Sequence, residues 1–289
     1  LAGSNSVKLD NQASFQKENY GGRNIHFGVR EHGMGAISNG LTQHGGLRSF
    51  VATFFVFSDY LRPALRLAAL SGIGDIWVFS HDSIMVGEDG PTHQPIEHLN
   101  SFRAMPNVAL LRPADANETA EAWKVAVERK DAPTILALTR QAVPTLDRQK
   151  FASAEGLRRG AYVLADLGEG STELVLMASG SEVDLIAKAG QILAEEGVSL
   201  RLVSFPSLEL FETQTKEYQD SVMLPGVNAR LAVEAGSSLG WHRWVGADGA
   251  LITLDRFGAS GPGEELFVEF GFTVENVLEK SRKLLAGKM

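Results

Sequence analysis

The sequence contains no cysteine among its 289 residues. Disulfide bridges, thiolate nucleophiles and metal sites built from cysteine are therefore excluded, and a reducing compartment such as the cytoplasm is the expected location. Long hydrophobic runs are also missing. The longest apolar stretches, near residues 51–57 and 174–177, are far shorter than the roughly 20 residues that cross a bilayer, so we expect no membrane span.

Basic residues are outnumbered by acidic ones. The chain has 27 Lys and Arg against 35 Asp and Glu, which gives a net charge of −8. Nucleic-acid binding requires Lys and Arg to neutralise phosphates, so a nucleic acid is not an expected partner. The shares of hydrophobic residues, 44%, and charged residues, 21%, are those of an ordinary globular protein.

The chain begins with Leu1 rather than Met, and no pattern of a signal peptide follows it. We expect that it starts within a longer protein. Its length predicts two domains, because 289 residues are more than one domain of ordinary size contains.

Short apolar runs alternate with longer amphipathic segments, which is typical of parallel sheets covered by helices. The sequence therefore predicts an α/β fold with two domains, each a mostly parallel sheet flanked by helices. Strands are expected at 25–29, 49–54, 76–80, 108–111 and 134–139, and in the second half at 174–178, 200–205, 230–233 and 251–254.

Three residues have the pattern of helix N-caps: Asp115, which Glu118 follows three positions later, Ser181 and Thr273. Between the two sets of strands, residues 141–159 turn polar and lose their periodicity, as an interdomain connection does. We assign the first domain to 1–145, the linker to 146–158 and the second domain to 159–289.

Polar residues gather after the predicted strand 76–80. His81 follows it directly, and the loop GEDGPTHQ then contributes Asp89 and His93. Loops that leave the carboxyl ends of parallel strands form ligand-binding crevices. Two histidines and a carboxylate also suit a divalent metal, but the glycines of the loop favour a substrate clamp.

Other candidates have simpler interpretations when taken alone. Glu31 would occupy the first turn of a helix, where a carboxylate commonly just balances the helix dipole. Phe54, Phe57 and Tyr60 have helix-like spacing, which usually indicates core packing. Arg140 follows the predicted strand 134–139 and is suited to bind a phosphate or carboxylate with two hydrogen bonds, although a surface ion pair is the ordinary alternative.

Taken together, these segments resemble the second half of transketolases over the whole chain. The resemblance is carried, in this order, by FGVREHGM, VATFFVFSDYLRPALRLAAL, SHDSIMVGEDGPTHQPIEHL, LRPAD, LTRQ, ASGSEV, VSFPS and residues 267–277. It implies a pyrimidine-binding domain of the thiamine-diphosphate-binding fold, followed by a transketolase C-terminal domain.

The resemblance implies a role for Glu31 that reverses the simpler interpretation. In that family the matching Glu hydrogen-bonds a ring nitrogen of the cofactor's aminopyrimidine and so helps to activate thiamine diphosphate. Phe57 would stack on the pyrimidine, and Phe54 and Tyr60 would complete its pocket.

The same resemblance implies substrate contacts. Asp89 matches the residue that hydrogen-bonds the hydroxyl beside the donor carbonyl, and His93 matches a residue near the carbonyl oxygen, where imidazole can move a proton. His81, Arg140 and, with the weakest match, Ser4 correspond to positions that bind the substrate phosphate.

No metal ligand is assigned to this chain. In the family, Mg²⁺ and the diphosphate are bound by a Gly-Asp-Gly motif in an N-terminal domain, and this chain has no Gly-Asp-Gly. The resemblance therefore implies sugar phosphates as substrates, thiamine diphosphate and Mg²⁺ as cofactors, and a site completed by an N-terminal domain or chain in a homodimer. The implied activity is ketol transfer in the pentose phosphate pathway.

Two alternatives remain open. Deoxyxylulose-phosphate synthases share the Glu and a similar DGPTHQ loop, whereas the β subunit of 2-oxoacid dehydrogenases is more distant. A catalytically silent assembly or binding subunit would also keep the fold. The presence of Glu31, Asp89, His93 and Arg140 together argues against the silent subunit, because such a subunit has no chemical need for all four.

Overall fold

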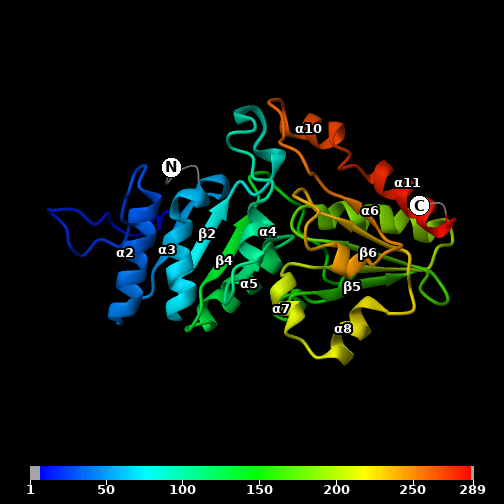
Figure 1. The fold of residues 1–289 in the computed structure, drawn as a ribbon, viewed down its shortest axis with the longest axis horizontal. Helices are drawn as coiled ribbons and strands as arrows, with labels where there is room; N and C mark the ends of the chain where they lie inside the picture. The colour runs from blue at the N-terminus through cyan, green and yellow to red at the C-terminus, as the bar shows by residue number, and fades with distance from the viewer. Residues whose placement is uncertain (1–6, 288–289) are drawn as a thin grey trace.

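A computed structural model describes residues 7–287, so the predicted phosphate ligand Ser4 lies outside the described residues. The chain forms two α/β units that lie side by side, one built on a four-stranded sheet and the next on a five-stranded sheet (Figure 1). Among the residues described, no helix has the length and apolar character needed to cross a membrane.

All strands of the first sheet are parallel, in the order β1-β2-β4-β3. They are β1 (Phe50–Phe54), β2 (Ile76–Ser80), β3 (Ala109–Leu111) and β4 (Thr134–Leu138). The helices of this unit are α2 (Glu31–His44), η1 (Phe55–Phe57), α3 (Ser58–Ser71), η2 (Ile84–Asp89), α4 (His98–Arg103) and α5 (Ala116–Glu128). Every residue of β2 is buried, which explains its unbroken apolar sequence.

The second sheet has the order β5-β7-β6-β8-β9, and only β5 runs antiparallel to its neighbour. Its strands are β5 (Tyr162–Leu167), β6 (Leu174–Ala178), β7 (Leu200–Ser204), β8 (Arg230–Val233) and β9 (Ala250–Ile252). Its helices are η3 (Ala154–Arg159), α6 (Glu182–Glu195), α7 (Leu208–Glu212), α8 (Lys216–Met223), α9 (His242–Val245), α10 (Gly263–Glu269) and α11 (Val274–Leu285). The predicted fold class, two mostly parallel sheets flanked by helices, is confirmed.

The strand predicted at 25–29 is wrong. The segment forms no strand, Ile25 and Val29 are 42% and 85% exposed, and Gly28 has φ of 64°, outside the extended region. An apolar run becomes a strand only where a neighbouring strand takes its hydrogen bonds, and the described chain offers none here. Conversely β5 was not predicted, because an antiparallel edge strand lacks the continuous apolar run of a buried parallel one.

Two of the three predicted caps are confirmed. The side chain of Asp115 accepts a hydrogen bond from the backbone N–H of Glu118, and Thr273 accepts one from Asn276. Helix α6 does begin after Ser181, but the Ser181 hydroxyl donates to the Glu182 carboxylate instead of capping the backbone.

The connection between the sheets is packed against the protein although its sequence is polar. Leu146 and Phe151 are buried, and Arg148 donates two hydrogen bonds to Asp115, at 2.8 and 2.9 Å. The segment therefore joins the two units closely. The domain limits 1–145, 146–158 and 159–289 stay a prediction.

A fully buried guanidinium links the two units. Arg112 follows β3 and is 0% exposed. Its Nε donates to Asp82 Oδ2 at 2.8 Å, and its Nη1 donates to the Ser179 carbonyl at 2.9 Å and to the Glu182 carboxylate. Asp82 belongs to the first unit, whereas Ser179 and Glu182 lie at the start of α6 in the second. Burial alone would lower the pKa of Arg112, but Asp82 and Glu182 raise it above its ordinary value.

A second buried ion pair crosses the same interface. Arg103 of α4 donates two hydrogen bonds of 2.7 Å to Glu234, which follows β8. Burial alone would raise the pKa of Glu234, but Arg103 lowers it to about 2. Apolar packing continues across the interface as well, since Ile84, Ile96 and Ala114 belong to the core of the second unit. The two units therefore form one packed body.

We predict that Arg112→Leu lowers the free energy of unfolding by about 3–5 kcal/mol, because Asp82 and Glu182 are left as buried charges without a partner. Urea unfolding followed by tryptophan fluorescence measures this. The variant that combines Arg112→Leu with Asp82→Asn and Glu182→Gln should recover part of the loss. As a control, Arg282→Leu removes an exposed ion pair with Glu196 and should leave the midpoint almost unchanged. Equal effects of the two Arg substitutions would contradict the prediction.

Candidate active site

The carboxyl ends of three parallel strands bring distant residues to one sheet edge. Phe54, Ser80 and Leu138 are in register as the last residues of β1, β2 and β4. His81 follows Ser80 directly, and Arg140 lies two positions after Leu138. The parallel order of the strands thus places Phe54, His81 and Arg140 at the same edge, where ligands bind in open α/β sheets.

Aromatic rings connect this edge to the histidine loop. Phe54 stacks on His81 with ring centres 3.7 Å apart and on Phe57 with centres 5.9 Å apart. Phe57 in turn meets the edge of His93 at 5.3 Å and the ring of Tyr60 at 6.3 Å. All five rings predicted for the cofactor pocket and the substrate site thus form one connected cluster, and this set is called the aromatic–histidine cluster below.

His81 has a backbone conformation that few residues adopt. Its φ is 64°, in the left-handed region. Such a conformation persists only where the surroundings hold it. Two contacts do so here: the Ser80 hydroxyl lies 2.9 Å from His81 Nδ1, and the next residue, Asp82, is held by the buried Arg112.

The second unit holds the histidine loop in place. Gln94 donates from Nε2 to the carbonyls of Gly87, at 3.0 Å, and of Ala259, at 2.9 Å. Gly90 has φ of 74°, and a Cβ built on it would lie 2.2 Å from Ser260 Oγ. Only glycine fits this close approach at a positive φ, which accounts for its place in the loop.

Within the loop, His93 is half-buried and Asp89 is exposed. The Thr92 hydroxyl lies 2.9 Å from His93 Nδ1, so this contact involves Nδ1 and does not occupy Nε2. Among the described residues, Asp89, His93 and His81 do not bring three ligand atoms within 4.8 Å of one another. The geometry therefore does not favour the metal-binding alternative for this loop.

Electrostatics at the edge favour a neutral His81. Burial and the charge of Arg140 lower the pKa of His81, and His93 acts in the same direction, whereas Asp82 and Asp89 oppose the change. The net result is a pKa below the ordinary value. These influences also show that the other three predicted substrate residues within the described chain, Asp89, His93 and Arg140, lie within electrostatic reach of His81.

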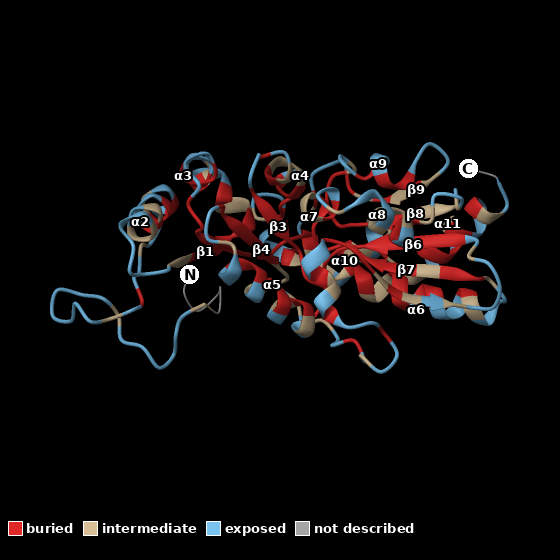
Figure 2. Cartoon of the chain, turned by 90° about the horizontal axis from the view of Figure 1, so that it is seen from below, coloured by how far each residue is buried: buried red, intermediate tan, exposed pale blue. Residues whose placement is uncertain are grey.

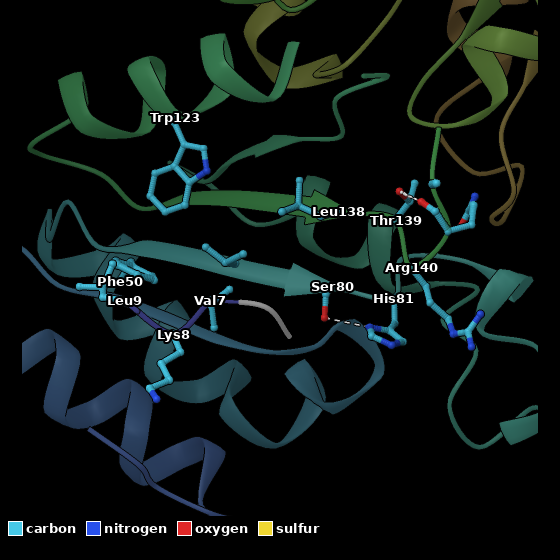
Figure 3. A pocket seen from close by; sticks show the side chains of 13 residues that line it. Val7, Lys8, Leu9, Phe50, Ser80, His81, Trp123, Leu138, Thr139 and Arg140 are labelled. Carbon is cyan, nitrogen blue, oxygen red and sulfur yellow. Dashed lines mark hydrogen bonds between the residues drawn. The ribbon is translucent and has the colours of Figure 1, made fainter. Parts of the chain in front are cut away.

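An open pocket of about 960 Å³ extends from this edge along the first sheet (Figure 3). Ser80, His81 and Arg140 lie at one end, and Phe50 and Trp123 lie at the other. Lys8 also lines the pocket and adds a second cation. The lining residues Lys8, Phe50 and Trp123 were not predicted from the sequence, because none of them belongs to a motif and only the fold brings them together.

Glu31 begins α2, as predicted, and is 8% exposed. Within the described part of the chain its carboxylate makes no hydrogen bond or ion pair. Helix α2 packs against α3, and Gly35 makes this possible because a Cβ there would lie 3.0 Å from Ala64 and Trp77. Glu31 is thus a shielded carboxylate with unused acceptor capacity on the helix beside the one that carries Tyr60.

Comparisons with known proteins find relatives over almost the whole chain. Residues 1–145 match the family described as the transketolase pyrimidine-binding domain, and residues 160–273 match the transketolase-like C-terminal domain. A transketolase of Geobacillus stearothermophilus is 55% identical over 285 residues, which cover 99% of this chain and 43% of the relative. The chain thus spans less than half the length of that relative.

Solved structures give the same result. A transketolase mutant of Pichia stipitis in complex with xylulose 5-phosphate superposes with a TM-score of 0.92 at 42% identity, over 99% of this chain and 42% of that one. A split-gene transketolase described as an inactive β4 tetramer superposes with a TM-score of 0.69 at 22% identity, over 90% of this chain and 83% of that one. The latter likeness shows the fold alone.

We predict that His81 titrates below its ordinary value, and that two substitutions move its pKa in opposite directions. Arg140→Leu removes a nearby positive charge and should raise the pKa, whereas Asp89→Asn removes a negative charge and should lower it further. NMR titration of the histidine ring protons measures both, with His81→Asn to assign the signal and Arg282→Leu as a distant control.

The lowered pKa of His81 also makes the stability of the fold depend on pH. Because folding lowers the pKa of His81, its neutral form contributes stability above the unfolded pKa, and the contribution is lost as pH falls through the folded pKa. His81→Asn should therefore flatten the loss of stability on acidification. A His81 pKa that does not respond to Arg140→Leu or Asp89→Asn would contradict the assigned causes.

Proposed function

The chain belongs to the transketolase family, and from this premise we propose that it supplies half of a site that transfers a two-carbon ketol unit from a ketose phosphate to an aldose phosphate. Thiamine diphosphate is the proposed cofactor. The observation that carries the proposal is the aromatic–histidine cluster, which joins the predicted pyrimidine pocket to the predicted substrate residues. Ketol transfer needs the cofactor and the sugar side by side.

The residues present fit the pyrimidine end of thiamine diphosphate. Phe57 is only half-buried, so one planar group can stack on it while Phe54 supports the other side. Glu31 offers a shielded carboxylate that can accept a hydrogen bond from a protonated ring nitrogen. When bound, the cofactor would supply a nucleophilic carbon and an electron sink for the chemistry at the ketose carbonyl.

The chain's own residues would bind and orient the sugar. His93 stands at the rim of the aromatic pocket, where its Nε2 can donate a proton to the carbonyl oxygen or take one back. Asp89 is exposed beside it and can accept a hydrogen bond from the neighbouring hydroxyl. Neutral His81 can donate one hydrogen bond to the phosphate, and the permanent charge of Arg140 supplies the main attraction.

The diphosphate and its Mg²⁺ are proposed to bind elsewhere. A diphosphate needs a divalent cation with oxygen ligands, and the Gly-Asp-Gly motif that supplies them in the family does not occur in this sequence. We assign these contacts to an N-terminal domain or chain, in keeping with the 43% of the Geobacillus relative that this chain spans. Sugar phosphates as substrates are supported by the xylulose 5-phosphate complex of the Pichia relative.

Exposed apolar side chains support a partner on one side of the molecule. Among the described residues, most large apolar side chains that are exposed lie between Leu9 and Leu70, including Val29, Leu47 and Tyr60. Figure 2 shows the pale-blue outer faces of α2 and α3 at that end of the molecule. Apolar surface of this kind usually marks an interface. We propose that it packs against the N-terminal domain in a homodimer, and that the assembly works in the cytoplasm.

A catalytically silent binding subunit is the alternative function, because such a subunit would keep the same fold. Complementation separates the two. The chain is mixed with the N-terminal part of the Geobacillus relative that has no counterpart in this chain, and with thiamine diphosphate and Mg²⁺. Transfer of the ketol unit from xylulose 5-phosphate to ribose 5-phosphate is then followed. Transfer supports the proposal. Turnover of pyruvate instead would indicate a synthase, and no turnover in a complex shown to assemble would indicate a silent subunit.

For Glu31 we predict a catalytic effect without a structural one. In the complemented enzyme, Glu31→Gln should lower kcat by about 100-fold or more, because an amide cannot take up the proton that the pyrimidine shares. Glu275→Gln is the matched control, since Glu275 also occupies the first turn of a helix and is exposed. Urea unfolding should show a similar small change in both variants. Unchanged kcat in Glu31→Gln would rule out the assigned role.

A further inference from the structure

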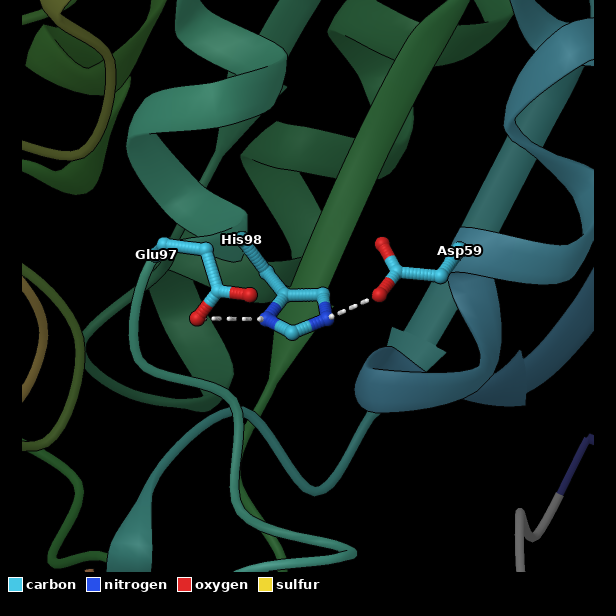
Figure 4. A group of neighbouring side chains, drawn as sticks. All are labelled: Asp59, Glu97 and His98. Carbon is cyan, nitrogen blue, oxygen red and sulfur yellow. Dashed lines mark ion pairs between the residues drawn. The ribbon is translucent and has the colours of Figure 1, made fainter. Parts of the chain in front are cut away.

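A second cluster of titratable groups lies outside the proposed substrate site. It consists of Asp59 in the first turn of α3 and of Glu97 and His98 at the start of α4 (Figure 4). His98 Nε2 lies 3.3 Å from Asp59 Oδ2, and His98 Nδ1 lies 3.8 Å from Glu97 Oε2. Figure 4 shows the imidazole ring between the two carboxylates, one facing each nitrogen.

The imidazole of His98 is buried and makes no hydrogen bond within residues 7–287. The residue is 3% exposed, and neither ring nitrogen has a hydrogen-bond partner there. A neutral imidazole carries one N–H and one bare nitrogen. With a carboxylate at each nitrogen, the lone pair of the bare nitrogen faces a lone pair of a carboxylate oxygen, and the two repel. A second proton on the ring, a proton on the carboxylate that faces the bare nitrogen, or a cation between nitrogen and carboxylate removes that conflict.

The spacing fits a cation. A tetrahedral ion with N and O ligands at about 2.0–2.2 Å keeps neighbouring ligand atoms about 3.3–3.6 Å apart. The separation between His98 Nε2 and Asp59 Oδ2 is 3.3 Å. One ligand atom from each of the three side chains lies within 4.8 Å of the other two, and no other group of three in residues 7–287 meets this condition.

Glu97 lies 3.8 Å from the second ring nitrogen of His98, slightly beyond hydrogen-bond distance, and is placed to become its partner. A metal-bound histidine commonly donates its second ring N–H to a carboxylate, which fixes the tautomer and the direction of the ring. Glu97 stands at Nδ1, on the side away from Asp59. Phe55 packs against the same ring with centres 5.6 Å apart and restricts its movement.

We propose that His98 Nε2 and Asp59 bind one divalent transition-metal ion such as Zn²⁺ or Mn²⁺, with Glu97 as the partner of Nδ1–H. Mixed imidazole and carboxylate ligands suit these ions better than Mg²⁺. Two protein ligands leave positions for water, and both carboxylates are 57% exposed, so the ion has access from solvent. This site is separate from the Mg²⁺ that the proposed cofactor requires.

The site would brace the aromatic–histidine cluster. Asp59 lies between Phe57 and Tyr60 in the sequence, and His98 lies five residues after His93. An ion shared by Asp59 and His98 therefore fixes α3 to α4. It would thereby fix Phe57 and Tyr60 relative to His93. Arg62 already joins the same helices through hydrogen bonds to Ser101 of 2.6 and 2.8 Å, so the fold does not depend on the ion.

Metal titration of the chain tests the proposal without thiamine diphosphate, sugar or an N-terminal partner, so its outcome is independent of the proposed function. Isothermal titration with ZnCl₂ and electron paramagnetic resonance with MnCl₂ should show one ion per chain. Asp59→Asn and His98→Gln should each weaken binding more than tenfold, and Glu97→Gln about tenfold. His242→Gln and Asp248→Asn, two exposed groups of the second unit, are the matched controls.

Anomalous scattering from Zn²⁺-soaked crystals locates the ion directly. A peak between His98 and Asp59 supports the proposal. Equal binding by wild type and by Asp59→Asn, with circular dichroism showing both folded, would place the ion elsewhere and overturn it. Absence of binding at about 1 mM of either metal would also overturn it and leave the three residues as an ion pair.

Discussion

The buried charge of Arg112 sets the relation between the two sheets. A guanidinium without access to water needs carboxylates in direct contact, and the two that it has come from different units. Asp82 is also the residue after His81, whose left-handed backbone needs support from its surroundings. One ion-pair network therefore both joins the units and holds the conformation of the histidine at the sheet edge.

This connection gives the second unit a part in the site although it contributes no reacting group. Its α6 supplies Glu182 to Arg112, and its segment at Ala259 and Ser260 closes over the histidine loop through Gln94 and Gly90. A loop of glycines and polar residues would otherwise sample many conformations at a cost in entropy. Packing against the second unit removes that freedom, which is what orientation of a substrate requires.

The sequence predicted the buried strands well and the partly exposed segments poorly. Strands β2 and β6 are apolar on both faces, and their limits were predicted to the residue. The segment 25–29 is also mostly apolar, but Ile25 and Val29 are exposed. A sequence does not distinguish residues that pack within the chain from residues that pack on a partner. Strand β5 was missed because only two of its six residues are fully buried and Asp166 interrupts its apolar run.

The candidate site divides in a similar way. The residues that belong to motifs, from Glu31 to Arg140, could be named in advance, and the cluster of rings they form follows from the parallel order of the strands. Arg112 could not, because a buried arginine is recognised only from its carboxylates, and one of them lies 70 residues away. The opposition of Asp59 and His98 likewise exists only once α3 and α4 are packed.

The site is closed on one side and open on the other, and this asymmetry follows from the same contacts. Toward the second unit, Gln94 and Arg112 hold the histidine loop and Asp82 by hydrogen bonds. Toward α2, Glu31 keeps a free carboxylate, and Tyr60 is 66% exposed. A shielded carboxylate without a hydrogen-bond partner and an exposed aromatic ring are both energetically unfavourable until a ligand or partner contacts them. In the proposed function, the chain would supply the substrate side of the site, and association with a partner would complete the cofactor side.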